Sequence, residues 1–422
     1  ATAAADSAAP VVPAVAPRTV TVETDKFIMT LSNKGGKVQS VIVKALKDTA
    51  GNYPELIQDT ALGALDLKLG AADLTDALFA VDAPEWITVD ADTSVQFTFT
   101  DANGNKVVRS YGFTKDGAAV RQVNRFVGFK PAAYELSWKG GMRETEVIPK
   151  GKSLGGASYF FSEVIYRDNE MTERETFSDA MTFDDASYYW VGMRRKYVAM
   201  SVQFDSPVPA KVNAKHVDVP TETNTDPGTY RLTIADETRG ADSVAYNFMV
   251  LPLQWDEVES LGQGYEKVIV TGSKWFPGSS VWFVWICKWL LKLLKFFYGL
   301  IPNYGVAIIL ITFVVRGLTT PFMVKQIKST RGMAALKPQM DEINVKYRTD
   351  PQKKQAAMME LYAKNGINPL QSCTGCLPML IQMPIFMGLF FVLGRAIELR
   401  GQHAFLWVTD LSRSDVVWSG IS

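Results

Sequence analysis

The sequence predicts a two-part membrane protein, in which a large antiparallel β-sandwich domain precedes an α-helical membrane domain. Residues 19–270 alternate apolar and polar side chains with period two and are interrupted by turn residues, as in antiparallel strands. Long apolar runs occur only after residue 280. One of these runs, residues 305–324, has the roughly 20 residues that a helix needs to cross a bilayer, and Arg316 is its only charged residue.

Composition limits how the chain can be organised. Its 422 residues have room for two or three structural units, and 44 basic residues balance 44 acidic ones, so net charge indicates no partner. Residues 1–18 are mostly Ala, Pro and Val and lack the basic start of a signal peptide, which predicts a linker. The chain begins without Met and stops without a terminating element, so we expect material to be missing at both ends.

Residues 19–270 have the pattern of successive β-hairpins. The apolar residues Phe27, Met29 and Leu31 are followed by the turn sequence Asn-Lys-Gly-Gly and by a second apolar alternation. Similar units recur as far as about Leu253, which predicts a large antiparallel sandwich. No cysteine lies in this region, so no disulfide framework holds it together.

Large β-sandwiches often bind sugars, and some act on them with a histidine and a carboxylate. His216 is the only histidine in this region, which argues against such an epimerase. A lectin-like groove lined by Trp86, Trp138 or Trp190 stays open as an alternative, although we expect these side chains to be core or surface aromatics.

Residues 271–303 change to a helical period and predict an amphipathic helix. Its apolar stripe includes Phe283 and Leu290, and tryptophans lie beside that stripe. Lysines would be costly in hydrocarbon, whereas tryptophan suits the depth of lipid headgroups, so we expect the helix to lie flat in the membrane interface. The lysines on the opposite stripe are Lys288, Lys292 and Lys295.

Residues 304–324 are predicted to form the first transmembrane helix, and Arg316 has two interpretations. An arginine near the centre of a span costs roughly 2.5 to 3.5 kcal/mol on insertion scales. Either the span ends at Val315 and Arg316 reaches the headgroups, or Arg316 faces a water-filled cavity within the membrane. Pro321 follows it near the end of the span.

Residues 325–370 predict an antiparallel helical hairpin. Apolar residues from Met333 to Tyr347 follow heptad spacing, and Asp350 with Pro351 predicts an N-cap and first position of a second helix. This segment contains nine basic and four acidic residues, so the positive-inside rule places the hairpin in the cytoplasm and the β-domain outside. The methionines that could either pack the seam or accept apolar clients are Met333, Met340, Met358 and Met359.

Residues 371–397 predict a second transmembrane helix, followed by an outer segment at 398–422. Gln382 is its one clearly polar side chain, and Pro378 and Pro384 are expected to kink it. Cys373 and Cys376 form a CxxC pair, which could bind metal or act in redox chemistry. Without a second such pair or a nearby histidine, we expect small buried thiols and no metal or other cofactor.

In its membrane half the chain resembles the YidC-type membrane protein insertases of Gram-negative bacteria. The resemblance covers about residues 275–393, with motifs in the family's order and spacing, and is weaker over the β-domain. Cys376 falls on the family's CxP position, whereas Cys373 departs from it. The motifs include Asn-Tyr-Gly at 303–305 before AIILITFVVR, Pro321, Gln326, LKPQM at 336–340, Asn368-Pro369 and CLPMLIQMPIF at 376–386.

The resemblance implies an inner-membrane insertase and chaperone, not an enzyme, whose periplasmic domain is a β-supersandwich largely dispensable for insertion. It implies a core of five membrane helices around a hydrophilic groove, open to the cytoplasm and lipid and closed outside. Arg316 matches the groove arginine, and we expect Thr312, one turn earlier, to line the groove too. Only two core helices are present, so residues 1–422 alone are expected to lack insertase activity.

The implied partners are nascent membrane proteins, the lipid bilayer and the Sec translocon, with the ribosome and targeting factors meeting the hairpin. Two alternatives belong to other classes of protein. A membrane-anchored periplasmic sugar-binding protein would leave Arg316 and the long basic hairpin without a role. A transporter would need more spans and a substrate site.

Overall fold

The computed structural model describes two compact units, residues up to Ile269 and residues from Val270 onward, and each is treated by itself. The described residues are 15–47, 51–146, 162–169, 171–219, 228–269, 281–365, 377–404, 408 and 410–412. Most of the predicted linker, residues 1–14, and the CxxC pair at 373 and 376 lie outside them. Within residues 15–18, Arg18 donates a hydrogen bond to the carbonyl of Ala83 at 2.5 Å.

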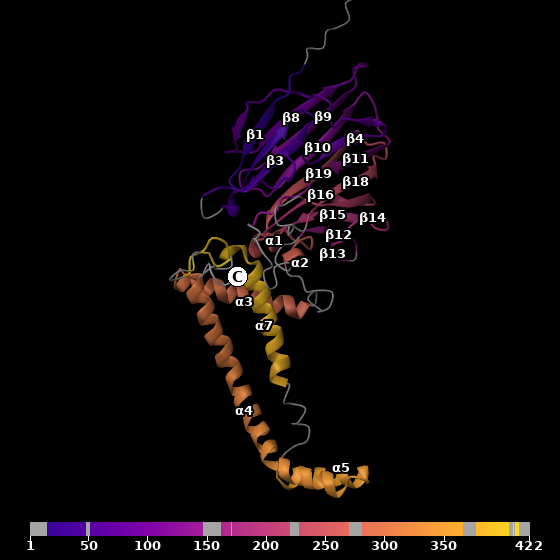
Figure 1. The fold of residues 1–422 in the computed structure, drawn as a ribbon. Coiled ribbons are helices and arrows are strands. Elements are labelled where there is room, and N and C mark those ends of the chain that lie inside the picture. The colour runs from indigo at the N-terminus through magenta and orange to yellow at the C-terminus, as the bar shows by residue number, and fades with distance from the viewer. Residues whose placement is uncertain are drawn as a thin grey trace, which may run out of the picture. The chain divides into compact units, whose positions relative to one another are not determined.

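The first unit consists of three β-sheets, so the predicted large antiparallel β-domain is confirmed (Figure 1). Among the described strands, one pairing is parallel, between β1 and β7, and departs from the antiparallel pattern. The four-stranded sheet runs β3 (Lys37–Val43), β2 (Phe27–Ser32), β1 (Thr19–Glu23) and β7 (Trp86–Thr88).

The other two sheets are larger. The nine-stranded sheet runs β13 (Thr172–Glu175), β12 (Glu163–Arg167), β15 (Tyr188–Arg194), β16 (Val198–Val208), β19 (Ser243–Pro252), β10 (Ala119–Val127), β9 (Lys106–Phe113), β8 (Thr93–Thr100) and β6 (Ala80–Val81). The six-stranded sheet runs β14 (Ala180–Phe183), β17 (Lys211–Val217), β18 (Thr229–Glu237), β11 (Ala133–Trp138), β4 (Asp66–Leu69) and β5 (Ala72–Asp73).

Side chains of the nine-stranded sheet contact both smaller sheets, which makes the domain a sandwich. Phe248 of β19 lies against Trp138 of β11, with ring centroids 5.4 Å apart. Tyr111 of β9 donates a hydrogen bond to the carbonyl of Gly36, in the turn between β2 and β3, at 2.5 Å. The core therefore lies between sheets whose contacting strands are distant in sequence. Aromatic residues such as Tyr111 and Phe248 are fully buried in it.

The predicted hairpin at Phe27 is formed by β2 and β3, with a bulge that the alternation did not predict. The register shifts between Thr30 and Leu31, where two residues of β3 face one of β2. Because of this extra residue, Val38 and Val41 are both fully buried, although they are an odd number of residues apart.

The described part of the first unit also contains the short elements η1 (Lys44–Leu46), α1 (Trp255–Leu261) and α2 (Glu266–Ile269). The segment of α1 and α2 is fixed to the nine-stranded sheet by Tyr265, whose ring stacks on Trp190 at 4.4 Å between centroids. The Tyr265 hydroxyl lies 2.8 Å from that of Ser201 on β16.

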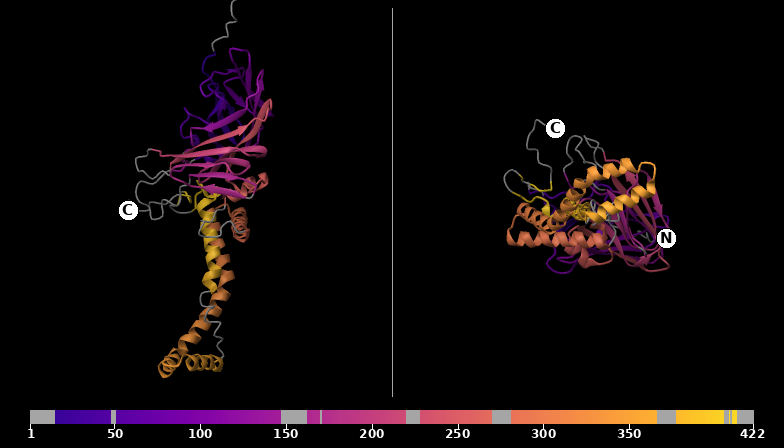
Figure 2. Two further views of the ribbon diagram at one scale, coloured as in Figure 1. Left: turned by 90° about the vertical axis from the view of Figure 1, so that its right-hand side faces the viewer. Right: turned by 90° about the horizontal axis from the view of Figure 1, so that it is seen from below.

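The second unit is helical, with α3 (Val281–Leu300), α4 (Tyr304–Lys346), α5 (Pro351–Lys364), α7 (Leu377–Arg395) and η3 (Ile397–Leu399). The first predicted span and the first hairpin arm form one continuous helix, α4, with Pro321 and Pro338 inside it. Asp350 caps α5 as predicted, accepting from the Lys353 amide at 3.2 Å. The far end of α4 and α5 lie side by side (Figure 2), and the Tyr362 hydroxyl is 3.7 Å from Met340 Sδ.

Candidate functional site

Helix α4 presents two different faces along its apolar part. One face is buried against α3 and α7 and contains Ala307, Ile311 and Val315, which are at most 5% exposed. These residues are spaced four apart, so they form one stripe along the helix. The predicted groove residues Thr312 and Arg316 each follow a residue of this stripe by one position, so they lie about 100° round the helix from it, on an exposed face of α4.

Arg316 and Thr312 lie one turn apart on this exposed face of α4. The Thr312 hydroxyl donates to the carbonyl of Ile308 at 2.9 Å, and the Thr320 hydroxyl donates to the carbonyl of Arg316 at 2.6 Å. Both threonines therefore satisfy their donors within the helix and tolerate an apolar environment. Arg316 is the group on this face that requires water or a counter-charge.

Within the described residues, no side chain forms an ion pair or hydrogen bond with the Arg316 guanidinium. Tyr304–Pro321 is the described helical stretch long and apolar enough to cross a membrane, with a mean hydropathy of 1.6, and Arg316 lies inside it. A charge in such a stretch without a protein partner favours contact with water, headgroups or another chain.

The second predicted span corresponds to α7. Its apolar stretch in the described residues, Gln382–Arg395, is shorter than a span requires. Gln382 and Pro384, which the sequence singled out in this span, are half-buried on α7, and Pro321 is exposed on α4. The α-helix continues through Pro384 and through Pro321.

Helix α3 packs its predicted apolar stripe against protein. Phe283, Leu290 and Leu294 are almost fully buried, and the Phe283 ring lies 5.7 Å from that of Phe391 on α7. The tryptophans are exposed instead, with Trp285 the most exposed at 65%. This exposed aromatic face is the part of α3 that suits lipid headgroups.

The three predicted interfacial lysines of α3 differ in their surroundings. Lys292 is exposed and Lys288 is half-buried. Lys295 forms an ion pair with Glu398 of η3, at 3.1 Å between Nζ and Oε1. Sequence reasoning did not single out Glu398, because it lies about a hundred residues away and belongs to no recognised pattern.

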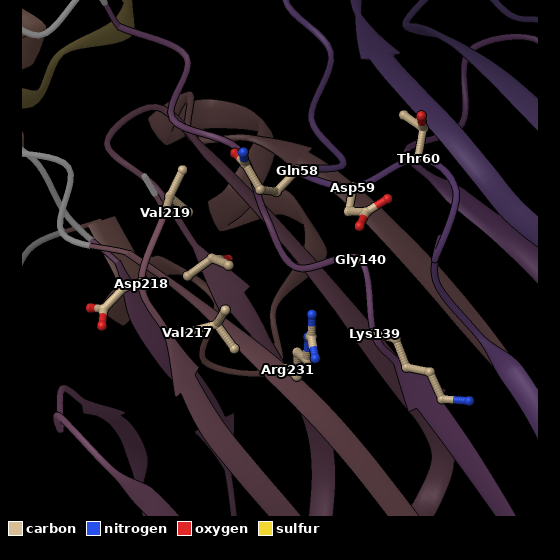
Figure 3. Close-up of a pocket in the computed structure, with 10 residues that line it drawn as sticks. Gln58, Asp59, Thr60, Lys139, Gly140, Val217, Asp218, Val219 and Arg231 are labelled. Carbon is tan, nitrogen blue, oxygen red and sulfur yellow. The ribbon is translucent and has the colours of Figure 1, made fainter. Parts of the chain in front are cut away.

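The aromatic residues proposed for a sugar-binding groove do not form one. Trp138 and Trp190 are core residues, at 3% and 0% exposed, and only Trp86 is exposed, at 54%. A polar hollow of about 340 Å³ lies elsewhere on the β-domain, and none of the described residues that line it is aromatic. Its charged side chains Lys139 and Asp218 extend away from Arg231 (Figure 3), so they do not converge on one ligand.

His216 and Cys287 both lie in packed surroundings. The His216 ring packs edge-on against Tyr230, with centroids 5.2 Å apart. Cys287 is buried, as expected of a small core thiol. Among the residues whose placement is described, no group of three or more His, Cys, Asp or Glu side chains could hold a metal ion.

Comparison with known proteins gives a consistent result over nearly the whole chain. Residues 19–292 match the model described as the YidC periplasmic domain, and residues 296–421 match that of the 60Kd inner membrane protein. The membrane protein insertase YidC of Chlorobium phaeovibrioides is 29% identical over 426 residues, which is 95% of this chain and 69% of that protein.

A further relative agrees with this result. The membrane protein insertase YidC of Geobacter metallireducens is 30% identical over 410 residues, covering 94% of this chain and 72% of that protein. A crystal structure of an active YidC insertase with its first transmembrane domain resolved is 18% identical, with a TM-score of 0.30, and the match covers 94% of this chain and 78% of that one.

Proposed function

The chain belongs to the YidC family of membrane protein insertases of the inner membrane, with its β-domain in the periplasm, and we propose that the Arg316 face of α4 lines a hydrophilic groove for client segments. The observation that carries this proposal is the position of Arg316. It lies inside the span candidate, on the face of α4 that α3 and α7 leave exposed.

Hydration of this face explains how the arginine can be accommodated. In hydrocarbon an arginine at mid-span costs roughly 2.5 to 3.5 kcal/mol, and a water-filled groove removes much of that cost. Because Thr312 and Thr320 bond to their own helix, they allow the groove wall to face either water or an apolar client.

The same arrangement supports a mechanism of insertion without nucleotide or metal. A polar or acidic segment of the client enters the groove partly hydrated, with Arg316 as its counter-charge. The apolar segment of the client then moves sideways into lipid, driven by about 0.8 kcal/mol for each buried methylene. Gln382, Pro384 and Pro321 act as positioning residues in α7 and α4.

The remaining parts have supporting roles in this proposal. The exposed tryptophans of α3 hold that helix at headgroup depth, with Lys288 and Lys292 towards the phosphates. The hairpin of α4 and α5 recruits clients on the cytoplasmic side and meets the ribosome or targeting factors through its basic residues. Met359 is 54% exposed there and suits varied apolar clients. The protein acts alone or with the Sec translocon.

The test is photocrosslinking to a ribosome-bound nascent client with a single apolar span. The photoreactive residue is placed at position 316 in the intact protein, and at Leu318 as a control. Leu318 is 60% exposed but lies about 160° round the helix, at roughly 100° for each residue. We expect client adducts at 316 that disappear as the client lengthens, and no client adducts at 318.

Substitution of Arg316 gives a functional readout of the same proposal. Arg316→Ala should slow insertion of a client with an acidic translocated segment by about tenfold, because one ion pair at a partly hydrated site is worth about 1 to 2 kcal/mol. Arg316→Lys should keep most of the rate. Equal rates for all three proteins, with only lipid adducts at 316, would show that Arg316 reaches the headgroups and lines no groove.

A further inference from the structure

We propose that the Lys295–Glu398 ion pair is a latch that holds α3 across the outer ends of α4 and α7 and closes this end of the helical unit to water. The β-domain is periplasmic, and α3, the next described element, lies flat at headgroup depth in the proposed function, so the junction of α3 with α4 lies on the outer side. Glu398 lies in η3, three residues beyond the end of α7. The pair thus joins the C-terminal part of α3 to the outer end of α7.

Burial of the pair is the first argument for a structural role. The Glu398 side chain is 10% exposed and the Lys295 side chain is 32% exposed, with Nζ and Oε1 3.1 Å apart. A carboxylate this deeply buried has lost most of its hydration and depends on its cation. Lys292, about one turn earlier on α3, is exposed.

Two further contacts join the same segments beside this pair. Tyr298 of α3 stacks on Tyr304, the first residue of α4, with centroids 3.9 Å apart and planes within 13°. Asn303 caps α4 by accepting from the Val306 amide at 3.1 Å, and its Nδ2 donates to the carbonyl of Ala404. Ile397, Leu399 and Ala404 are buried around these contacts.

The convergence of these contacts explains why the latch matters for insertion. The proposal rests on the proposed function in one respect: a groove that opens to the cytoplasm must be closed at its periplasmic end. Opening of α3 would expose the apolar surfaces of α4 and α7 to the periplasm. The latch itself can be measured without any insertion assay.

Cys287 is a native reporter of this opening. Its thiol is 1% exposed, on the α3 face packed against α7. In a protein with Cys373→Ser and Cys376→Ser, a membrane-impermeant maleimide is added from the periplasmic side and the labelling rate is measured. We expect Lys295→Glu or Glu398→Lys to raise the rate about tenfold, because each leaves like charges in a buried site.

The reversed pair separates the latch from a general loss of stability. Lys295→Glu with Glu398→Lys should return labelling to within about twofold of the parent, since the interaction is restored with opposite polarity. Lys106→Glu, with the same change in charge at an exposed position of β9 in the β-domain, should leave the rate unchanged. If a reversal prevents accumulation of the protein, Lys295→Met and Glu398→Gln replace it. Single variants that label like the parent, or a double variant that labels like the singles, would overturn the latch.

Insertion and crosslinking from position 316 are measured in the same membranes. The groove proposal and the latch proposal can therefore be tested independently. Restored labelling in the reversed pair supports the latch even if position 316 yields no client adducts, which would overturn the groove alone. Client adducts at 316 combined with unchanged labelling in every variant would overturn the latch and leave the groove.

Discussion

At the scale of single residues, burial is the main cause of the raised pKa of Glu144 in the β-domain. Its side chain is 3% exposed, and the nearest cation, Arg195, is 3.8 Å away between Nη1 and Oε2. Burial raises the pKa of Glu144 from 4.5 to about 7, against the opposing effect of Arg195. Nothing in the local sequence predicts this, because Arg195 is remote in the chain and itself fully buried.

This raised pKa makes the stability of the β-domain depend on pH. The folded domain keeps the Glu144 proton up to about pH 7, whereas the unfolded chain releases it near pH 4.5. The contribution is therefore fully present below pH 4.5 and is lost as pH rises to about 7. We expect the parent domain to lose about 3 kcal/mol more than Glu144→Gln over this range, at about 1.4 kcal/mol for each pH unit.

Urea unfolding of the β-domain at pH 4.5, 6 and 7.5 measures this difference. Glu237→Gln is the control. Because Glu237 is exposed on β18, this variant should show the same pH dependence of stability as the parent. Parallel pH profiles for the parent and Glu144→Gln would contradict the prediction.

Arg316 and Lys295 show what the sequence can say about a single charge. Arg316 could be singled out because it interrupts an apolar run, and that pattern is local. Lys295 shares its spacing with Lys288 and Lys292, so the three were predicted to be alike. Only the fold distinguishes Lys295, by bringing Glu398 to it.

At the scale of elements, periodicity predicted which residues pack but not what they pack against. The apolar stripe of α3 was correctly found, yet its partners are α4 and α7, and the close approach to α7 depends on Gly388. A Cβ at position 388 would lie 3.0 Å from Leu290 Cδ1 and 3.2 Å from Ile286 Cγ2. A glycine within an apolar run does not by itself indicate that another helix packs closely against it. In the same way, the alternation of β2 and β3 did not indicate their bulge.

This packing predicts a disulfide between α3 and α7 in the variant Gly388→Cys. A Cβ at position 388 would lie 3.8 Å from Cys287 Sγ, which is within reach of a disulfide with an S–S bond of about 2.05 Å. After mild oxidation and protease cleavage in the hairpin, the two fragments should stay joined until reductant is added. Both other cysteines are replaced by serine in this experiment.

Gly394→Cys provides the matched control on the same helix. No described heavy atom lies within 4 Å of a Cβ at position 394, so this variant should give separate fragments with or without reductant. Equal crosslinking at positions 388 and 394 would mean that α3 does not pack on α7 as described.

At the scale of the whole molecule, the two units follow different physical rules, and the sequence distinguishes them for that reason. The β-domain alternates with period two because each strand has one face in the sandwich core. The helical unit has long apolar stretches because lipid replaces water around it. Its polar residues cannot be placed by such patterns, since their partners lie in other helices, in water or in other proteins.

Charge distribution predicts how the molecule is oriented across the membrane. The β-domain is periplasmic, α4 contains the span candidate Tyr304–Pro321, and residues 325–364 beyond it contain nine basic and four acidic residues. An excess of Lys and Arg is retained on the cytoplasmic side. A cysteine at the exposed Thr349 should therefore react with an impermeant maleimide only from the cytoplasm, whereas Ser260→Cys on α1 should react only from the periplasm. Labelling of both positions from the periplasm would mean that α4 does not cross the bilayer.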